Sequence, residues 1–330
     1  MTPTTRLLSR TDVEALLDMP ACVHAVDDAF RRRGEGRAGA TGVLGLHVPG
    51  GGFHVKAAAL DLSRPYVAAK VNANFPGNPA RHGLPTIQGA VVLFDATAGA
   101  ILAIVDSIAI TTLRTAATTA VAATYLARAE ASTAAFIGCG VQARAHVAAL
   151  LVVRPIAHAV AFDADPAGAE QFAIDMRARH GISVSVANTL SQATAARDIV
   201  VTCTPSRQAF LGLRHIAPGT FIAAVGADND DKQELEPALL AAAALVVDDG
   251  DQCSTIGDLH HALVAGVMRR DDVRAELADV VRDPARGRQR DDEIVIFDST
   301  GVALEDVAVA ALAFERAVER GIGTEVRLGG

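Results

Sequence analysis

The sequence predicts an α/β protein with a doubly wound parallel sheet and a second region of mixed α/β structure. Three observations lead to this expectation. The chain has 330 residues, half of them hydrophobic, which is enough material for two packed domains. Strand-like and helical segments alternate from about residue 115 onward. A glycine-rich turn follows the first strand of that series, at residues 138–143.

The region before residue 115 is expected to contain one helix followed by hairpins. An amphipathic pattern predicts the helix over residues 11–33. The strand-like segments that follow, interrupted by Gly and Pro, are TGVLGLHVPGGGFHVKAAAL, YVAAKVNANFP and QGAVVLFDATAGAILAIVD. In the last of them, DATAGA between two apolar runs indicates a hairpin. Sequential hairpins favour an antiparallel or mixed sheet, so we do not expect this region to bind a nucleotide.

The later region alternates strands with helices. After a helix over about 112–128, the pattern predicts AAFIG, VQARAHVAALLVV, HAVAFD, PAGAEQFAIDMRARH, ISVSVA, LSQATAAR and DIVVTCT in turn, then TFIAAVGAD, LLAAAALVVDD and EIVIFDS. Short helices between strands are typical of a parallel, doubly wound sheet. The last helix, VALEDVAVAALAFERAVER, is expected to return to the first region. The predicted domains are therefore 1–115 with 305–330, and 116–304.

The turn from Gly138 through Gly140 to Ala143 has the small residues that a dinucleotide-binding turn requires. The first glycine permits a tight strand-to-helix turn, and the second lets the backbone approach a pyrophosphate. The third small residue allows close helix–strand packing, while the helix N-terminus offers N–H donors to the phosphates. Residues 116–304 are therefore predicted to form a Rossmann domain.

Asp163 indicates which dinucleotide is bound. It ends the next strand, 25 positions after Gly138 (163 − 138), where an acceptor for a ribose hydroxyl is expected. No basic residue beside it would receive a 2′-phosphate, and its carboxylate would repel one. The sequence thus favours NAD(H), with NADP(H) as the alternative. Asp165-Pro166 is predicted to cap the following helix, which is compatible with this role of Asp163.

Composition argues against several other classes of protein. The formal net charge is −8, and Arg31-Arg32-Arg33, a predicted helix C-terminus, is the largest basic cluster, so no nucleic-acid partner is expected. The four cysteines form no CxxC and no disulfide framework. Neither a secretory signal nor an apolar stretch of about 18 residues occurs, so we expect a cytoplasmic protein without a membrane partner. No metal is expected, because adjacent His260 and His261 would not face one site.

Five motifs, found together in this order, resemble the ornithine cyclodeaminase/mu-crystallin family. They are KVNANFPGNPARHGLPTIQGAVVLFD, TTLRTAA, IGCGVQARAH, AVGADNDDKQEL and VIFDSTGVALEDV. The similarity extends over about residues 50–320. It implies a Rossmann domain plus a discontinuous mixed α/β domain that binds substrate and forms the interface of a homodimer. This agrees with the organisation predicted above.

The resemblance also implies roles for individual residues. Lys70 and Arg114 match the positions that hold the substrate carboxylate, and Asp228 matches the acid/base residue beside the reacting α-carbon. Thr300 matches a substrate-side position. The remaining matches are to cofactor-contacting positions, and they add to Gly138, Gly140 and Asp163, which the turn itself predicts: Thr86, Val141, Gln142, Thr204, Val225, Lys232 and Ser299.

Judged without the resemblance, these residues have structural alternatives. Lys70 and Arg114 would be surface charges, and Asp228 a turn residue in an Asp-rich loop. Lys70, however, lies in an apolar run where an unpaired charge would be unfavourable, which favours the functional interpretation. Ser299-Thr300-Gly301 is predicted to cap the last helix and could also contact ligands.

Lys56 departs from the family pattern. Cyclodeaminases carry a glutamate at this position, where it helps with a diamine substrate, and an arginine about eleven residues earlier. This chain has Lys56, and no arginine between Arg37 and Arg64. At about 4 Å, two like charges cost on the order of 4 kcal/mol at an effective dielectric near 20. We therefore expect ornithine's distal ammonium to be disfavoured, and Lys56 to bind carboxylate or donate a proton.

The leading hypothesis is NAD(P)H-dependent reduction of a cyclic α-imino acid, Δ1-pyrroline-2-carboxylate or Δ1-piperideine-2-carboxylate, to proline or pipecolate. One alternative is ornithine cyclodeaminase, which uses NAD+ catalytically. Another is alanine-dehydrogenase-type activity on pyruvate and ammonia. The fourth is a non-catalytic, mu-crystallin-like binder, against which the low aromatic content of 4% argues.

Overall fold

The computed structural model describes residues 4–328, which form two compact units. Unit 1 takes in the described residues up to Thr115 and from Val302 onward, and unit 2 comprises Ala116–Gly301. The sequence-based boundaries were placed after residue 115 and after residue 304.

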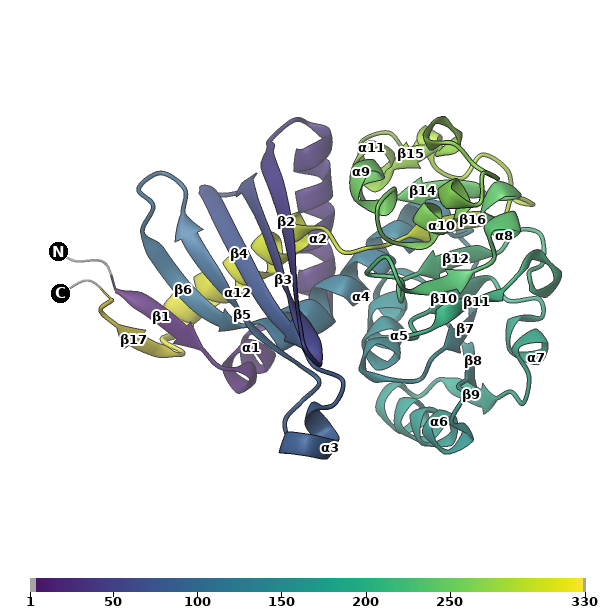
Figure 1. The fold of residues 1–330 in the computed structure, drawn as a ribbon, viewed down its shortest axis with the longest axis horizontal. Coiled ribbons are helices and arrows are strands. Elements are labelled where there is room, and N and C mark those ends of the chain that lie inside the picture. Colours follow the sequence, from purple (N-terminus) through teal and green to yellow (C-terminus); the bar gives the residue numbers. More distant parts are fainter. Residues whose placement is uncertain (1–3, 329–330) are drawn as a thin grey trace. The chain divides into compact units, whose positions relative to one another are not determined.

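Unit 1 contains a seven-stranded mixed sheet in the order β17-β1-β6-β5-β4-β3-β2 (Figure 1). Neighbours from β2 to β6 pair antiparallel, whereas β1 runs parallel to β6. The DATAGA hairpin is confirmed, because it connects β5 to β6. The strands are β1 (Thr5–Leu8), β2 (Ala38–Val48), β3 (Gly51–Asp61), β4 (Pro65–Asn74), β5 (Ile87–Asp95), β6 (Ile101–Asp106) and β17 (Thr324–Val326).

The helices of unit 1 differ from prediction at two points. The expected single helix over 11–33 is wrong, because Asp18 accepts a hydrogen bond from Ala21 N and begins a second helix with Pro20 in its first turn. The helix expected from 112 begins at Ser107. Asp106 Oδ1, just before it, accepts hydrogen bonds from Ile108 N and Ala109 N in its first turn. The observed helices are α1 (Arg10–Leu16), α2 (Met19–Gly34), α3 (Asn78–His82), α12 (Ala303–Arg320) and α4 (Ser107–Leu126), which belongs to unit 2 from Ala116 onward.

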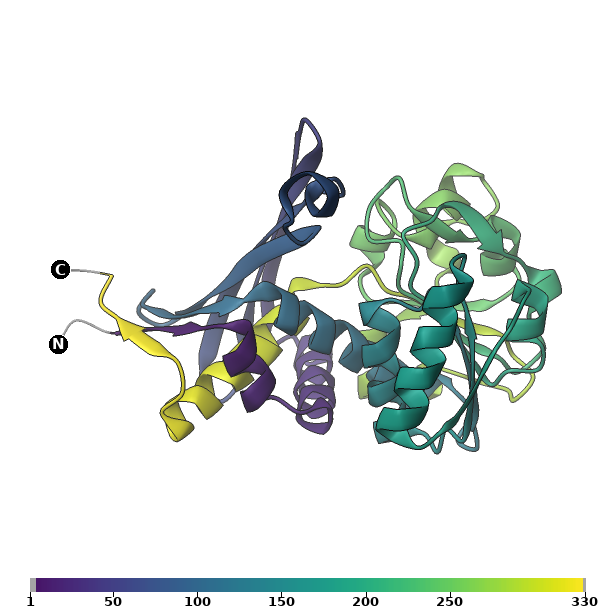
Figure 2. The ribbon, with the colours of Figure 1, turned by 90° about the horizontal axis from the view of Figure 1, so that it is seen from below.

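Helix α12 packs on the sheet of unit 1. It contacts β3, β4 and α2, and it lies along one face of the sheet in both views (Figure 2). Alternate residues of β3 and β4 are buried on that face, and two of them, Ala58 and Ala68, are small enough to let a helix approach closely. Lys56 and Lys70 belong to the same alternating rows. The fold therefore brings both lysines to the helix.

Unit 2 contains an eight-stranded sheet in the order β15-β14-β16-β12-β10-β7-β8-β9, with every pair parallel. This confirms the doubly wound prediction. The strands are β7 (Thr133–Ile137), β8 (His158–Phe162), β9 (Ser183–Val186), β10 (Ile199–Thr202), β12 (Phe221–Ala224), β14 (Ala244–Val247), β15 (Ala275–Glu276) and β16 (Val295–Asp298), with β11 (Arg207–Leu211) and β13 (Gln233–Leu235) forming a separate pair.

The strand order of unit 2 reverses between β7 and β10. Ligands of such sheets bind at the carboxyl ends of the strands beside this reversal, which makes it the expected cofactor site. Helices α5 and α6 match the prediction residue for residue, and α7 ends three residues earlier than expected. The helices are α5 (Val141–Val153), α6 (Pro166–His180), α7 (Leu190–Thr194), α8 (Pro237–Ala241), α9 (Gly250–Cys253), α10 (Asp258–Val264) and α11 (Leu277–Arg282). Within residues 4–328, no helix has the length and apolar character that crossing a bilayer requires.

Candidate functional site

Two predicted substrate-binding residues meet in the interior of unit 1. Lys70 Nζ lies 2.7 Å from Asp306 Oδ2, and Arg114 Nη1 lies 2.7 Å from Glu305 Oε2. Arg114 Nε is also 3.3 Å from Asp306 Oδ1, so Asp306 joins the two cations. Lys70 and Arg114 are only 3% and 6% exposed, which rules out the alternative that they are surface charges.

Burial and neighbouring charge change the protonation of this cluster. Burial, with help from Arg114, lowers the pKa of Lys70 to about 8, although Asp306 opposes that shift. Burial would raise the pKa of Asp306, but Lys70 and Arg114 outweigh it and hold that pKa below its usual value. Asp306 is therefore ionised at neutral pH, and Lys70 is close to its titration range.

Lys56 belongs to the same cluster. It stands directly opposite Lys70 in the antiparallel pairing of β3 with β4, and it is 9% exposed. Directly opposite residues have Cβ atoms about 4.5–5.5 Å apart, and like charges there repel. The positive charge of Lys56 contributes to lowering the pKa of both Lys70 and Asp306. Three cations are thus gathered in one buried region of unit 1.

Sequence reasoning missed Glu305 and Asp306, the counter-ions of this cluster. Both lie in the first turn of α12, where negative charge is favoured by the helix dipole, and Glu305 Oε1 accepts from Val302 N. A signal was present, because these two acids interrupt an otherwise apolar run from residue 302 to residue 313. Two adjacent acids on a buried helix need buried partners, and cations are one kind of partner that satisfies them.

In unit 2, the glycine turn has the geometry that a dinucleotide requires. Gly138 has φ +90°, and a Cβ there would lie 2.8 Å from the Thr204 side chain, so no other residue fits. A Cβ at Gly140 would meet no atom within 4 Å, which leaves open space beside the first residue of α5. Val141 is 67% exposed at that helix N-terminus, and Gln142 Oε1 is buried without a hydrogen-bond partner. The left-handed glycine, the open space and the helix N-terminus fit a phosphate group at the turn, whereas the Gln142 oxygen, an acceptor, does not add to this fit.

Asp163 contacts this turn directly. Its Oδ2 accepts a hydrogen bond from Cys139 N at 2.7 Å, and its Oδ1 accepts from Asp165 N at 2.9 Å. Each oxygen keeps a further lone pair for a ligand hydroxyl. The predicted cap is confirmed, since Asp165 accepts from Ala167 N at the start of α6. Asp163 therefore orients the turn and remains able to accept from a ribose.

The loops after β10 and β12 carry four more of the predicted residues. Thr204 follows β10, and Val225 N donates to Thr202 O, so the two strand ends lie side by side. Beyond Val225, Asp228 Oδ1 is 2.6 Å from Lys232 Nζ. The predicted acid/base residue is thus paired with a predicted cofactor contact.

Ser299 and Thr300 follow β16 and are almost fully buried within unit 2. Thr300 N and Oγ1 both donate to Asp248, and Gln252 Nε2 donates to Thr300 Oγ1. The prediction that Ser299-Thr300-Gly301 caps the last helix is wrong, because the cap of α12 is Val302. The substrate-side role of Thr300 stays a prediction.

Thr86 belongs to unit 1, unlike the other predicted cofactor contacts. It precedes β5, and its carbonyl accepts a hydrogen bond from Phe75 N at 2.8 Å. Its role stays a prediction. Among the described residues, no group of three or more His, Cys, Asp or Glu side chains has the arrangement of a metal site.

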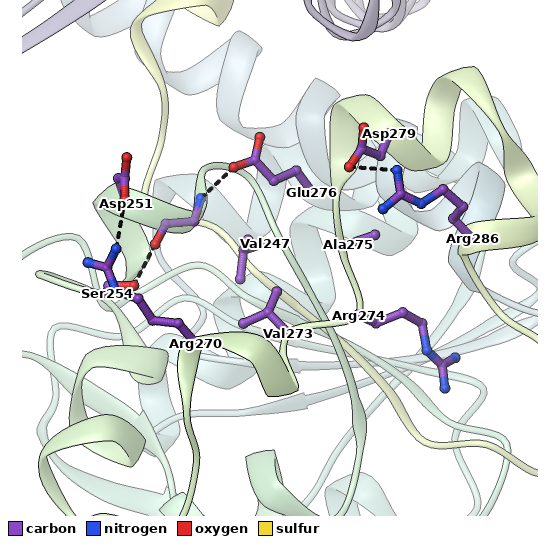
Figure 3. A pocket seen from close by; sticks show the side chains of 11 residues that line it. Val247, Asp251, Ser254, Arg270, Val273, Arg274, Ala275, Glu276, Asp279 and Arg286 are labelled. Atoms are coloured by element: carbon purple, nitrogen blue, oxygen red, sulfur yellow. Dashed lines mark hydrogen bonds and ion pairs between the residues drawn. The ribbon is translucent and has the colours of Figure 1, made fainter.

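A cavity of about 350 Å³ lies at the ends of β14 and β15 in unit 2 (Figure 3). Four of its six charged side chains form two ion pairs: Arg270 Nη1 is 2.8 Å from Asp251 Oδ1, and Arg286 Nη1 is 2.9 Å from Asp279 Oδ2. None of the predicted site residues lines this cavity. We therefore assign it no part in the candidate site.

Known proteins resemble this chain over nearly its whole length. The model of the ornithine cyclodeaminase/mu-crystallin family matches residues 4–321. An archaeal alanine dehydrogenase dimer with bound NAD is 36% identical, with a TM-score of 0.94, and the match covers 99% of this chain and 100% of that one.

Two further solved structures are similar. Δ1-Pyrroline-2-carboxylate reductase of Thermococcus litoralis, in complex with NADH and L-proline, is 34% identical with a TM-score of 0.92, over 98% of this chain and 100% of that one. Iminosuccinate reductase of Paracoccus denitrificans, in complex with NAD+, is 30% identical with a TM-score of 0.90, over 99% and 100%.

Proposed function

This chain belongs to the ornithine cyclodeaminase/mu-crystallin family, and we propose that it is an NAD(P)H-dependent reductase of a small cyclic 2-imino acid. The substrate is Δ1-pyrroline-2-carboxylate or Δ1-piperideine-2-carboxylate, and the product is the corresponding L-amino acid. The observation that carries the proposal is the buried cation cluster of unit 1, in a chain whose relatives include three nicotinamide-binding proteins of imino- and amino-acid chemistry.

The charge of that cluster favours a substrate with one carboxylate. The buried charged residues of unit 1, among those described, are three cations and two carboxylates, which leaves one positive charge (3 − 2): Lys56, Lys70 and Arg114 against Glu305 and Asp306. One monoanionic substrate neutralises this excess. A dicarboxylate such as iminosuccinate brings a second negative charge for which the cluster has no counterpart. A diamine such as ornithine adds an ammonium that Lys56 repels.

Nicotinamide supplies the hydride for the imine carbon. The glycine turn and the N-terminus of α5 would hold the pyrophosphate of the dinucleotide, and Asp163 would accept from a ribose hydroxyl. The same carboxylate repels a 2′-phosphate, so NADH is the preferred donor. Asp163→Ser should lower the ratio of NADH to NADPH activity about tenfold or more, as measured from kcat/KM for each cofactor.

Unit 1 contributes orientation of the substrate. Arg114 binds its carboxylate as a planar fork and Lys70 as a point charge, while the buried acids fix both cations in place. Asp228 stabilises the protonated imine nitrogen, which becomes the amine once the carbon is reduced. These residues mainly place and polarise the substrate, since the hydride comes from the cofactor.

Alanine-dehydrogenase-type activity is the second candidate. It is favoured by the similarity to the archaeal alanine dehydrogenase, with a TM-score of 0.94. The imine of pyruvate is also a 2-imino acid with one carboxylate, so the charge argument applies equally to it. In the first candidate the imine carbon and nitrogen belong to one ring, and in the second they do not. The activity test distinguishes the two.

We also propose that the protein is a homodimer. Strand β2 lies at the edge of the sheet of unit 1, and it exposes Val43, Leu44 and Leu46 by about half. A long apolar edge strand is normally covered by another chain or protected from it. Light scattering coupled to gel filtration tests this state, and Leu46→Asp should shift a dimer toward monomer.

The activity test follows reduced nicotinamide and ammonia in parallel reactions of the purified protein. Δ1-Pyrroline-2-carboxylate with NADH or NADPH should give the fastest cofactor oxidation. Pyruvate with ammonium as the best substrate would favour the second candidate. Ammonia from ornithine and NAD+ without net NADH would make the protein a cyclodeaminase, and no turnover of any imine would exclude a reductase.

A matched pair of variants links this result to the cluster. Lys56→Met removes the excess charge and should raise KM for the imino acid while relaxing discrimination against ornithine. Arg37 is an exposed arginine of unit 1, so Arg37→Met removes one positive charge outside the cluster. This variant should change neither the KM for the imino acid nor the discrimination against ornithine. Equal effects of both variants would contradict the charge argument.

A further inference from the structure

Glu234 of β13 connects the ends of two neighbouring strands. Its Oε1 accepts from Thr204 N at 2.6 Å and from Thr204 Oγ1 at 2.7 Å. Its Oε2 accepts from Thr202 Oγ1 at 2.6 Å and from Gly226 N at 2.8 Å. Thr202 ends β10 and Thr204 follows it, whereas Gly226 follows β12. One carboxylate therefore holds the loops that carry Thr204, Val225 and Asp228.

The space around Glu234 is tightly filled. A Cβ at Gly226 would lie 2.5 Å from Glu234 Cδ and 2.3 Å from Thr204 O. On the other side of the loop, the Thr204 side chain would lie 2.8 Å from a Cβ at Gly138. Glu234 therefore contacts Thr204, and Thr204 in turn packs against the glycine turn. Any displacement of Thr204 changes the space beside Gly138.

Glu234 is itself fixed by a second buried carboxylate. It is fully buried, and Asp258 Oδ1 accepts from Glu234 N at 2.9 Å and from Leu235 N at 2.8 Å. Asp298 in turn accepts from Leu259 N at 2.8 Å, beside Asp258. Burial raises the pKa of Glu234, and hydrogen bonds from Thr202 and Thr204 oppose that rise. No buried lysine or arginine of unit 2, among the described residues, balances this charge.

We propose that Glu234 is a positioning residue for the cofactor: it holds the loops after β10 and β12 against the glycine turn before the dinucleotide binds. This inference rests on the proposed use of NAD(H). Glu234 does not contact the reacting atoms. Its contribution is to cofactor affinity, because loops already in place need no ordering when the ligand arrives.

Only a carboxylate satisfies all four donors. In Glu234→Gln, one of the two oxygens becomes an amide nitrogen, which faces either Thr204 N or Gly226 N. The threonine hydroxyls can rotate to accept from that nitrogen, but a backbone N–H cannot reverse its direction. One loop therefore loses its backbone hydrogen bond while the shape of the side chain is kept.

The test measures the dissociation constant for NADH by the fluorescence of bound nicotinamide, using Glu234→Gln in the full-length protein. The control is Glu236→Gln, two residues along, whose carboxylate pairs with the exposed Arg214. We expect Glu234→Gln to raise the dissociation constant at least tenfold and Glu236→Gln to change it less than twofold. At saturating NADH, kcat of Glu234→Gln should stay within about threefold of the unchanged protein, and the melting temperature without cofactor within a few degrees.

Other results overturn the inference. If folded Glu234→Gln binds NADH as tightly as the unchanged protein, Glu234 does not position the cofactor, although the proposed function stands. If the unchanged protein binds no nicotinamide, the proposed function fails as well. Should Glu234→Gln not fold, hydrogen exchange on the unchanged protein decides: residues 202–206 and 225–228 should be protected before NADH is added. Protection that appears only with NADH would contradict the inference.

Discussion

The two units compensate buried charge in different ways. In unit 1, charges of opposite sign meet, as Lys70 and Arg114 lie against Asp306 and Glu305 at 2.7 Å. In unit 2, four carboxylates are fully buried, and no lysine or arginine of its described residues is buried with them: Glu234, Asp248, Asp258 and Asp298. Backbone N–H groups and hydroxyls satisfy these acids instead.

The difference indicates two uses of buried charge. Unit 1 keeps one positive charge in excess, which suits it to attract an anion. Unit 2 uses its carboxylates as acceptors that join neighbouring loops, and burial raises the pKa of three of them, Glu234, Asp258 and Asp298. Burial, reinforced by Glu234, raises the pKa of Asp258 to about 7, whereas burial lowers that of Lys70 to about 8. Neutralising Asp306 should therefore destabilise unit 1, whereas neutralising Asp258 should stabilise unit 2.

Asp306→Asn should have the largest effect. The change leaves Lys70 and Arg114 with one carboxylate between them, and breaking a buried ion pair in this way costs about 3–5 kcal/mol of unfolding free energy. Denaturant unfolding measures the loss. Glu319→Gln, at an exposed position of the same helix, is the control and should stay within about 0.5 kcal/mol. A similar loss of unfolding free energy in both variants would show that the ion pairs of Asp306 contribute no more to stability than an exposed charge does.

Asp258→Asn should act in the opposite direction. Its Oδ1 accepts two backbone hydrogen bonds that an amide oxygen can keep, and its Oδ2 has no partner. The pKa of Asp258 is raised from 3.8 to about 7. Its contribution to stability is therefore present below about pH 4 and lost as the pH rises through about 7. The variant should be about 1–2 kcal/mol more stable than the unchanged protein at pH 8, and the gain should shrink by pH 5. A loss of stability at pH 8 would refute this account of unit 2.

Lys70 should make the binding of an anionic substrate pH-dependent. Because its pKa is lowered to about 8, its charge is lost above that pH, and affinity for an unreactive carboxylate should then fall about tenfold per pH unit. Pyrrole-2-carboxylate is a suitable probe, titrated in the presence of NADH. Lys70→Arg keeps its charge at these pH values and should bind with little pH dependence. For stability, the lowered pKa makes the contribution of Lys70 present above 10.5 and lost as the pH falls through about 8. Affinity that stays constant from pH 7 to 10 would exclude Lys70 as a carboxylate ligand.

Asp251→Asn should have the smallest effect. Asp251 pairs with Arg270 at 2.8 Å beside the cavity of Figure 3, but their side chains are 92% and 58% exposed. Water screens such a pair, so the melting temperature should change by about 1 °C or less. A larger change in melting temperature would show that this ion pair stabilises the protein in spite of its exposure.

Local signals explain why parts of unit 2 could be predicted closely. Helix α5 begins at a glycine turn, and α6 begins at an aspartate cap with Pro166 and ends at Gly181 in the left-handed region. Both helices match the prediction because each signal lies within a few residues of the boundary it sets. In unit 1, the cap at Asp18 and Pro20 was also local, but the continuous apolar periodicity over 11–33 concealed the break.

The sequence by itself determined the two-part organisation, the parallel sheet, the glycine turn and the family, because periodicity and short motifs encode these features locally. Only the tertiary structure decided how the charges are compensated. Lys70 and Asp306 are 236 residues apart in the chain, and they meet because α12 returns to the sheet of unit 1. Glu234 joins loops from two strands that become neighbours only when the sheet forms. Which charges meet in the interior depends on proximity in the folded chain. The spacing of residues along the sequence does not encode that proximity.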